Sequence, residues 1–169
     1  MSTGRHNLTK RDWLRWRRSD ESTTSGVMIL SPDFKDFFAS LNKARVRYLV
    51  VGGYAVALHG HPRYTKDIDI WVGLDEENAR RLVQAIEDFG FGSLGLAADD
   101  FLVPDRIVQL GYPPSRIDLL TTLPGVAFEA CFPSAVEVTI DGLTVTFNPY
   151  RTISIPALHA RSRWPGSGR

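Results

Sequence analysis

Residues 50–70 read VVGGYAVALHGHPRYTKDIDI, and the architecture of the chain can be worked out from them. An apolar run leads into Gly52-Gly53, a short helix is expected next, and a strand that carries Asp67 and Asp69 follows. Side chains two residues apart on a strand point to the same face of a sheet. The two carboxylates are therefore predicted to stand side by side.

This arrangement has chemical consequences. Two adjacent carboxylates concentrate negative charge, which is costly unless a cation lies against them, and a hard divalent metal such as Mg²⁺ is the usual partner. A glycine turn that opens a helix offers backbone N–H groups to an anion such as phosphate. Together these features predict chemistry on a phosphate ester, of the kind that nucleotidyl transfer requires.

A third carboxylate occurs in the segment RIDLL, where Asp118 lies between the apolar residues Ile117 and Leu119. If this strand neighbours the strand of the aspartate pair, three carboxylates converge, and such a cluster suits two Mg²⁺ ions and an in-line displacement. The alternative for Asp118 is an ion pair with Arg116, two residues away on the same face.

The residue types suggest individual roles. Asp67 and Asp69 are expected to hold a metal that bridges a triphosphate, and Asp118 is expected to help bind a second metal near the attacking hydroxyl. Gly52 and Gly53 allow a phosphate to approach the backbone closely.

Three further polar residues, Arg63, Thr65 and Lys66, lie just before the aspartate pair. We expect them to contact phosphate as part of the nucleotide site. The alternative is that they are solvated loop residues that balance local charge.

Other patterns are given structural interpretations. The segment GFGSLG at residues 90–95 has the G-x-G-x-x-G spacing, but it follows a helical pattern instead of a strand, so it is interpreted as a helix stop and a loop. His59 and His61 are expected at a helix end and not as metal ligands. Cys131 is expected to be a packed side chain.

Apolar periodicity predicts an α/β (α+β) domain, with a mixed central sheet and helices mainly on one face. Asp141-Gly142 predicts a two-residue hairpin turn. Besides the short helix over 54–59, helices are expected to begin at Ser31-Pro32-Asp33 and at Asp75, the latter ending at Gly90, and strands are expected over 47–51, 67–72, 106–110, 116–120, 136–140 and 143–147.

The chain has 169 residues, which suits one domain, and we expect that domain over residues 28–156. Residues 1–27 carry six Lys/Arg and three Asp/Glu, a net charge of +3, and are interpreted as a disordered basic extension. Trp13 and Trp16 leave open an RNA-contacting arm. Residues 157–169 are expected to be a disordered or truncated tail.

Composition narrows the class of protein. Hydrophobic residues make up 43% and charged residues 23%, as in ordinary globular proteins, and the net charge of +1 argues against a dedicated nucleic-acid-binding surface. A single cysteine fits a reducing compartment. Without a run of about 18 apolar residues, we expect a cytoplasmic protein that makes no membrane contact.

These motifs resemble the DNA polymerase β-like nucleotidyltransferase superfamily. The shared pattern is Gly52-Gly53, thirteen residues, then Asp67-Ile-Asp69, with Asp118 as the third acid. The segments YLVVGGYAV, RYTKDIDIWV and GYPPSRIDLLT look like small bacterial minimal nucleotidyltransferases, including relatives of abortive-infection toxins. The resemblance spans about residues 31–156. It implies the nucleotidyltransferase fold and Mg²⁺-dependent transfer of a nucleoside monophosphate from an NTP to a hydroxyl on RNA or protein.

The chain departs from that pattern in two places. Many members have serine where this chain has Gly53, and relatives usually continue into a basic helix with a Gly-Arg-x-x-Asp segment where this chain has residues 158–169. These departures favour an alternative function, a weakly active or inactive nucleotide-binding or regulatory module of a toxin–antitoxin pair, with a small helical partner.

Overall fold

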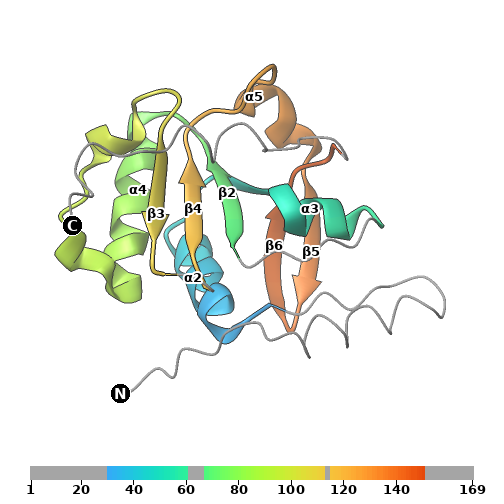
Figure 1. The fold of residues 1–169 in the computed structure, drawn as a ribbon, viewed down its shortest axis with the longest axis horizontal. Coiled ribbons are helices and arrows are strands. Elements are labelled where there is room, and N and C mark those ends of the chain that lie inside the picture. Colours follow the sequence, from blue (N-terminus) through green and yellow to red (C-terminus); the bar gives the residue numbers. More distant parts are fainter. Residues whose placement is uncertain (1–29, 61–66, 113–114, 151–169) are drawn as a thin grey trace.

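The computed structural model describes residues 30–60, 67–112 and 115–150. Its strands form a six-stranded mixed sheet in the order β3-β4-β2-β1-β6-β5 (Figure 1). The main elements are α2 (Pro32–Lys43), β1 (Tyr48–Val51), α3 (Gly52–Leu58), β2 (Ile68–Val72), α4 (Glu76–Ile86), β3 (Ile107–Leu110), β4 (Ile117–Leu120), α5 (Phe128–Cys131), β5 (Val136–Ile140) and β6 (Leu143–Phe147).

The sheet contains both parallel and antiparallel strand pairs. β2 runs parallel to β4 and β1 runs parallel to β6, whereas the β1–β2, β3–β4 and β5–β6 pairs are antiparallel. As a result, β1 ends at the same edge of the sheet where β2 and β4 begin. The glycine turn and the predicted carboxylates lie at this end of the strands.

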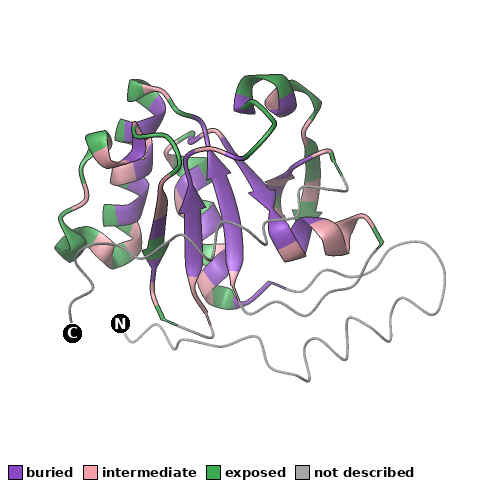
Figure 2. Ribbon diagram, turned by 45° about the horizontal axis from the view of Figure 1, so that its top comes forward, coloured by how far each residue is buried: buried purple, intermediate pink, exposed green. Residues whose placement is uncertain are grey.

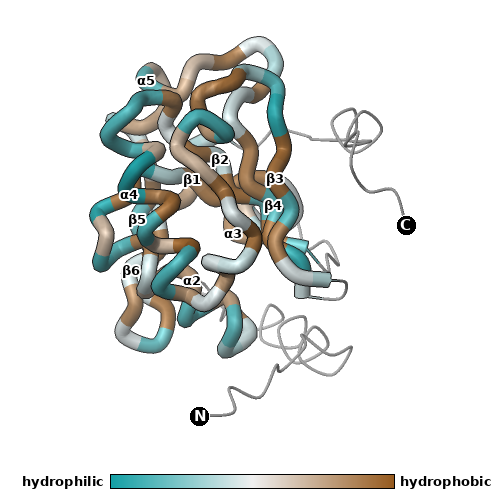
Figure 3. Tube along the Cα trace, turned by 90° about the vertical axis from the view of Figure 1, so that its left-hand side faces the viewer, coloured by the Kyte–Doolittle hydropathy of each residue, from teal (hydrophilic) through white to brown (hydrophobic). Residues whose placement is uncertain are grey.

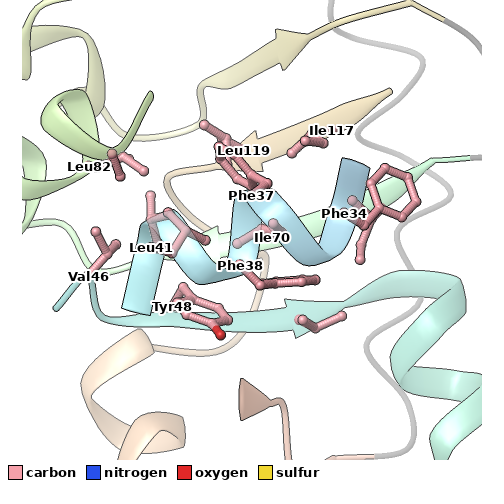
Figure 4. Close-up of a cluster of buried hydrophobic side chains, with 14 of the residues drawn as sticks. Phe34, Phe37, Phe38, Leu41, Val46, Tyr48, Ile70, Leu82, Ile117 and Leu119 are labelled. Atoms are coloured by element: carbon pink, nitrogen blue, oxygen red, sulfur yellow. The ribbon is translucent and has the colours of Figure 1, made fainter. Parts of the chain in front are cut away.

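One face of the sheet is covered by α2 and α4, and it holds the larger core. Ser31 caps α2 by accepting a hydrogen bond from the N–H of Phe34 at 3.2 Å, as expected for serine at an N-cap. Phe37, Phe38 and Leu41 on α2 are buried in a cluster with residues of β1, β2 and β4 (Figure 4). The prediction of helices mainly on one face is confirmed.

The opposite face carries a smaller cluster. Leu49, Val51, Trp71 and Leu120 pack there with α5, and the rings of Trp71 and Phe128 meet edge to face with centroids 5.2 Å apart. The central strands are buried along their length (Figure 2), and hydrophobic residues follow them while α4 and α5 carry hydrophilic stretches (Figure 3). The two clusters explain why these strands are apolar at nearly every position.

Local details differ from the sequence expectations in two places. The short helix predicted over 54–59 begins two residues earlier, at Gly52, because this glycine has a positive φ of 68° that lets the strand turn directly into the helix. The helix predicted to end at Gly90 is regular only to Ile86 and continues as a π-helical turn over Glu87–Phe91.

Other expectations hold. Asp141 and Gly142 both have positive φ and connect β5 to β6 as a tight hairpin. The expectations for residues 1–27 and 157–169 lie outside the described residues. Within the described ranges, no helix is both long enough and apolar enough to cross a membrane.

Candidate active site

The register of the sheet brings the predicted carboxylates together. Asp69 on β2 and Asp118 on β4 are Cα partners across the parallel pair, and neighbouring strands lie about 4.8 Å apart. Asp67 precedes Asp69 by two residues and therefore belongs to the same face. This is the face of Trp71 and Leu120, opposite the α2 core, so the three side chains converge where β2 and β4 begin.

Two of the three carboxylates are deeply buried. Asp118 is 0% exposed and Asp69 is 6% exposed. Carboxylates are almost never fully buried unless they are paired, because removing the charge from water is expensive. The burial of Asp118 therefore requires a cationic partner.

Arg116 is that partner. Its Nε donates to Asp118 Oδ1 at 2.7 Å and its Nη2 donates to Asp118 Oδ2 at 2.9 Å, while Nη2 also donates to Asp67 Oδ2 at 2.9 Å. The hydrogen bonds to Asp118, with the nearby negative charges, raise the pKa of Arg116 above its ordinary value although burial alone would lower it. The ion pair considered for Asp118 is thus present, and it coexists with the convergence of the three carboxylates.

The arrangement bears on metal binding. Carboxylate oxygens are the ligands that hard divalent cations prefer, so the donor set of Asp67, Asp69 and Asp118 fits Mg²⁺ in kind. The positive charge that faces Asp67 and Asp118 in this structure comes from Arg116. Within the described part of the chain, no group of three or more His, Cys, Asp or Glu side chains is arranged so that it could hold a metal ion.

The glycine turn lies directly against this cluster. Val51, the last residue of β1, is the Cα partner of Asp69, and Gly52 follows with a φ of 68°. A Cβ atom on Gly52 would lie 2.2 Å from Asp69 Oδ2, closer than any real contact allows. Gly52 is therefore required at this point by the backbone conformation and by the aspartate.

The sequence reasoning did not single out Asn148, which directly follows β6. This residue is 0% exposed, and its N–H donates to the carbonyl of Val50 at 3.0 Å, which continues the parallel ladder with β1. Alternation from Phe147, which packs in the α2 core, places the Asn148 side chain on the carboxylate face. That alternation was the available signal.

The remaining expected residues have the following positions. Gly90–Gly95 forms turns after α4 and not a strand-to-helix connection, as predicted. His59 lies at the C-terminal end of α3, and its Nε2 donates to the carbonyl of Asn148 at 3.1 Å. Cys131 is buried, and this burial raises the pKa of its thiol. The other expected residues, Arg63, Thr65, Lys66 and His61, lie outside the described residues.

Comparison with known proteins adds family information. Residues 33–112 match the family model described as aminoglycoside-2''-adenylyltransferase, and this segment includes the glycine turn and the first two aspartates but ends before Asp118. No curated protein matches the chain. A Thermotoga maritima crystal structure, provisionally described as a nucleotidyltransferase, is similar at 16% identity and a TM-score of 0.45, over 92% of this chain and 85% of that chain. The family match covers the glycine turn and the aspartate pair, so over this segment the chain is similar to a family of nucleotidyltransferases.

Proposed function

We propose that the protein transfers a nucleoside monophosphate from an NTP to a hydroxyl group on RNA or protein, with Mg²⁺ as cofactor. The observation that carries this proposal is the register match of Asp69 with Asp118 beside the Gly52 turn. It supports a concentrated carboxylate cluster directly beside the glycine turn.

The proposed chemistry is an in-line displacement. The acceptor hydroxyl oxygen bonds to the α-phosphorus of the NTP, and the bond from that phosphorus to the pyrophosphate oxygen breaks, so pyrophosphate leaves with the electron pair. Asp67, Asp69 and Asp118 would hold Mg²⁺, which neutralises charge on the triphosphate and on the leaving group. The hydroxyl proton passes to a carboxylate oxygen of the cluster, for which Asp118 is the candidate.

Other residues of the chain would position the reactants. Gly52 and Gly53 let the triphosphate approach the backbone at the start of α3. Arg116 fixes the orientation of Asp118 and Asp67 through its three hydrogen bonds. We propose in addition that the segment 61–66 contributes phosphate contacts from Arg63, Thr65 and Lys66.

The test is a labelling experiment. The purified protein is incubated with each radiolabelled NTP, Mg²⁺ and cell extract, and transfer of label to RNA or protein is measured. An Asp67→Ala, Asp69→Ala double variant should transfer none. An Asp36→Ala, Asp99→Ala double variant, which removes two exposed carboxylates from other elements, should label as the wild type does. Equal labelling by both variants would contradict the proposal.

One observation favours the second candidate function, a regulatory module with little turnover. Arg116 donates hydrogen bonds to both Asp67 and Asp118, so carboxylate oxygens that would bind a metal are engaged by a side chain of the protein itself. Such a module would bind Mg²⁺–ATP in calorimetry, transfer no label, and co-purify with a small helical partner of the antitoxin type. A lone protein that transfers label contradicts this candidate.

A further inference from the structure

Asn148 is held firmly by its backbone at the edge of the carboxylate face. Its N–H donates to Val50 at 3.0 Å, and its carbonyl accepts a hydrogen bond from His59 Nε2 at 3.1 Å. The side chain is shielded from solvent, because the residue is 0% exposed. Its polar atoms must therefore find partners within the molecule or on a ligand.

Among the described residues, one end of the side-chain amide has such a partner and the other does not. Oδ1 accepts a hydrogen bond from the N–H of Tyr150 at 3.4 Å. Nδ2 has no hydrogen-bond partner anywhere in the parts of the chain that the structure describes. A buried donor without an acceptor destabilises the folded state, and such groups are rare in native proteins unless they serve a ligand or a water molecule.

A second buried asparagine shows what a purely structural role looks like in this protein. Asn78 is 2% exposed, and its Oδ1 accepts from the N–H of Arg47 at 2.7 Å. Its Nδ2 donates to the carbonyls of Arg47 and Gly73 at 3.0 and 2.9 Å. Both the oxygen and the amino group of the Asn78 side chain make hydrogen bonds within the fold, whereas the amino group of Asn148 makes none with the described residues.

The position of Asn148 indicates which ligand it could serve. β1 lies between β6 and β2, so Asn148 and Asp69 flank the last residues of β1 from opposite sides, where the chain turns into Gly52. Asp69 is the Cα partner of Val51, and Asn148 donates to Val50. Both side chains lie on the same face by alternation. The amide therefore borders the point at which the triphosphate is placed by the proposed function.

We propose that Asn148 is a nucleotide-binding residue whose Nδ2 donates to a triphosphate oxygen. This inference rests on the proposed function, because it assumes that a nucleotide occupies the carboxylate face. The amide is neutral, so it adds a donor next to the carboxylates without altering the charge of the site. A hydrogen bond from a neutral donor to a charged acceptor is among the stronger ones in proteins.

The experiment is a calorimetric titration of the full chain, in the presence of Mg²⁺, with ATP, with inorganic tripolyphosphate and with adenosine. Asn148→Asp retains the size and the oxygen that Tyr150 uses, but it replaces the donor by an anion, and we expect its affinity for ATP and tripolyphosphate to fall by about 100-fold. Asn148→Leu removes the donor without adding charge, and we expect a loss of about tenfold.

Thermal unfolding separates binding from structure. Asn148→Leu removes a buried donor that has no partner in the described residues, and with it the acceptor of the long hydrogen bond from the exposed Tyr150, so its midpoint should differ little from that of the wild type. Asn78→Asp is the matched control, because it breaks hydrogen bonds that the fold uses. This variant should unfold at a lower temperature and bind ATP with wild-type affinity.

The outcomes distinguish this inference from the proposed function. Wild-type affinity for ATP in both Asn148 variants overturns the role of Asn148 and leaves the proposed function standing. A wild-type protein that binds neither ATP nor tripolyphosphate overturns both. Binding of adenosine that depends on Asn148, with tripolyphosphate unaffected, overturns the assignment to phosphate. If Asn148→Leu does not fold, the affinity of Asn148→Asp decides.

Discussion

Gly52 and Asp69 share one space: a Cβ atom on the glycine would lie 2.2 Å from Oδ2 of the aspartate. The contact follows from the antiparallel register, in which Val51 is the Cα partner of Asp69. The turn and the carboxylate strand are therefore one structural unit. A change at the turn must move the aspartate.

Gly52→Ala tests this unit. The variant should lose more stability than a left-handed backbone conformation alone explains, about 1–2 kcal/mol, because Asp69 must also be displaced. Gly142→Ala is the matched control, since Gly142 has a φ of 80° and open space around its Cα. Free energies of unfolding in urea give the comparison. Equal losses in the two variants would show that the Asp69 contact has no energetic weight.

Arg116→Gln should be strongly destabilising. It leaves Asp118 buried without a charged partner, and breaking a buried ion pair on one side typically costs about 3–5 kcal/mol. Arg116→Lys keeps the charge but loses the bidentate geometry, so it should lie between this variant and the wild type. Arg81→Gln is the control, because the Arg81–Glu77 pair is largely exposed and should contribute less than about 0.5 kcal/mol. Similar losses at Arg116 and Arg81 would contradict the assignment.

Added Mg²⁺ should stabilise Arg116→Gln and the wild type to different extents. If the carboxylates of Asp67, Asp69 and Asp118 bind a divalent cation, Mg²⁺ should raise the unfolding midpoint of Arg116→Gln more than that of the wild type, because the cation replaces the lost guanidinium charge. Thermal unfolding with and without Mg²⁺ measures this without any assay of activity. An equal response in both proteins counts against metal binding by this cluster.

We expect the protein to lose stability at alkaline pH because of Tyr48. Burial raises the pKa of its phenol to about 12, so the folded protein keeps the proton while the unfolded chain loses it near pH 10. The unfolded state then binds fewer protons, and the free energy of unfolding should fall by about 2–3 kcal/mol as the pH rises from 10 to 12. Tyr48→Phe should lack this part of the decline in denaturation measured at several pH values.

For Asp75 we expect the opposite pH dependence, a stabilisation that is lost as the pH falls. Burial by itself raises the pKa of this carboxyl group, but hydrogen bonds from the N–H of Asn78 and from Arg47 outweigh it and lower the pKa. The stabilisation is therefore complete above the unfolded pKa, about 3.9, and is lost as the pH falls through the folded pKa. Asp75 caps α4, so Asp75→Ala should cost about 0.5–2 kcal/mol at pH 7. The difference from the wild type should shrink at low pH, and Asp75→Asn should retain the cap.

Much of the fold could be predicted because it follows from patterns among residues close together in the sequence. The apolar spacing of Phe34, Phe37, Phe38 and Leu41 predicted the buried face of α2, and Asp141-Gly142 predicted the hairpin. The period of two along β2 placed Asp67 and Asp69 on one face. These properties depend on side-chain direction within a single element, which neighbouring residues determine.

The site depended on contacts between elements that are distant in sequence. Sequence alone left open whether the strand of Asp118 neighbours that of Asp69, and whether Arg116 pairs with it. The sheet order and the β2–β4 register answered both questions, with the arginine bound to two carboxylates at once. Asn148 was overlooked for the same reason, since its proximity to Val50 arises only from parallel pairing of β6 with β1. The sequence by itself determined which residues face the same way, because side-chain alternation is local, whereas only the tertiary structure decided which of them meet, because strand order and register arise from packing of the whole sheet.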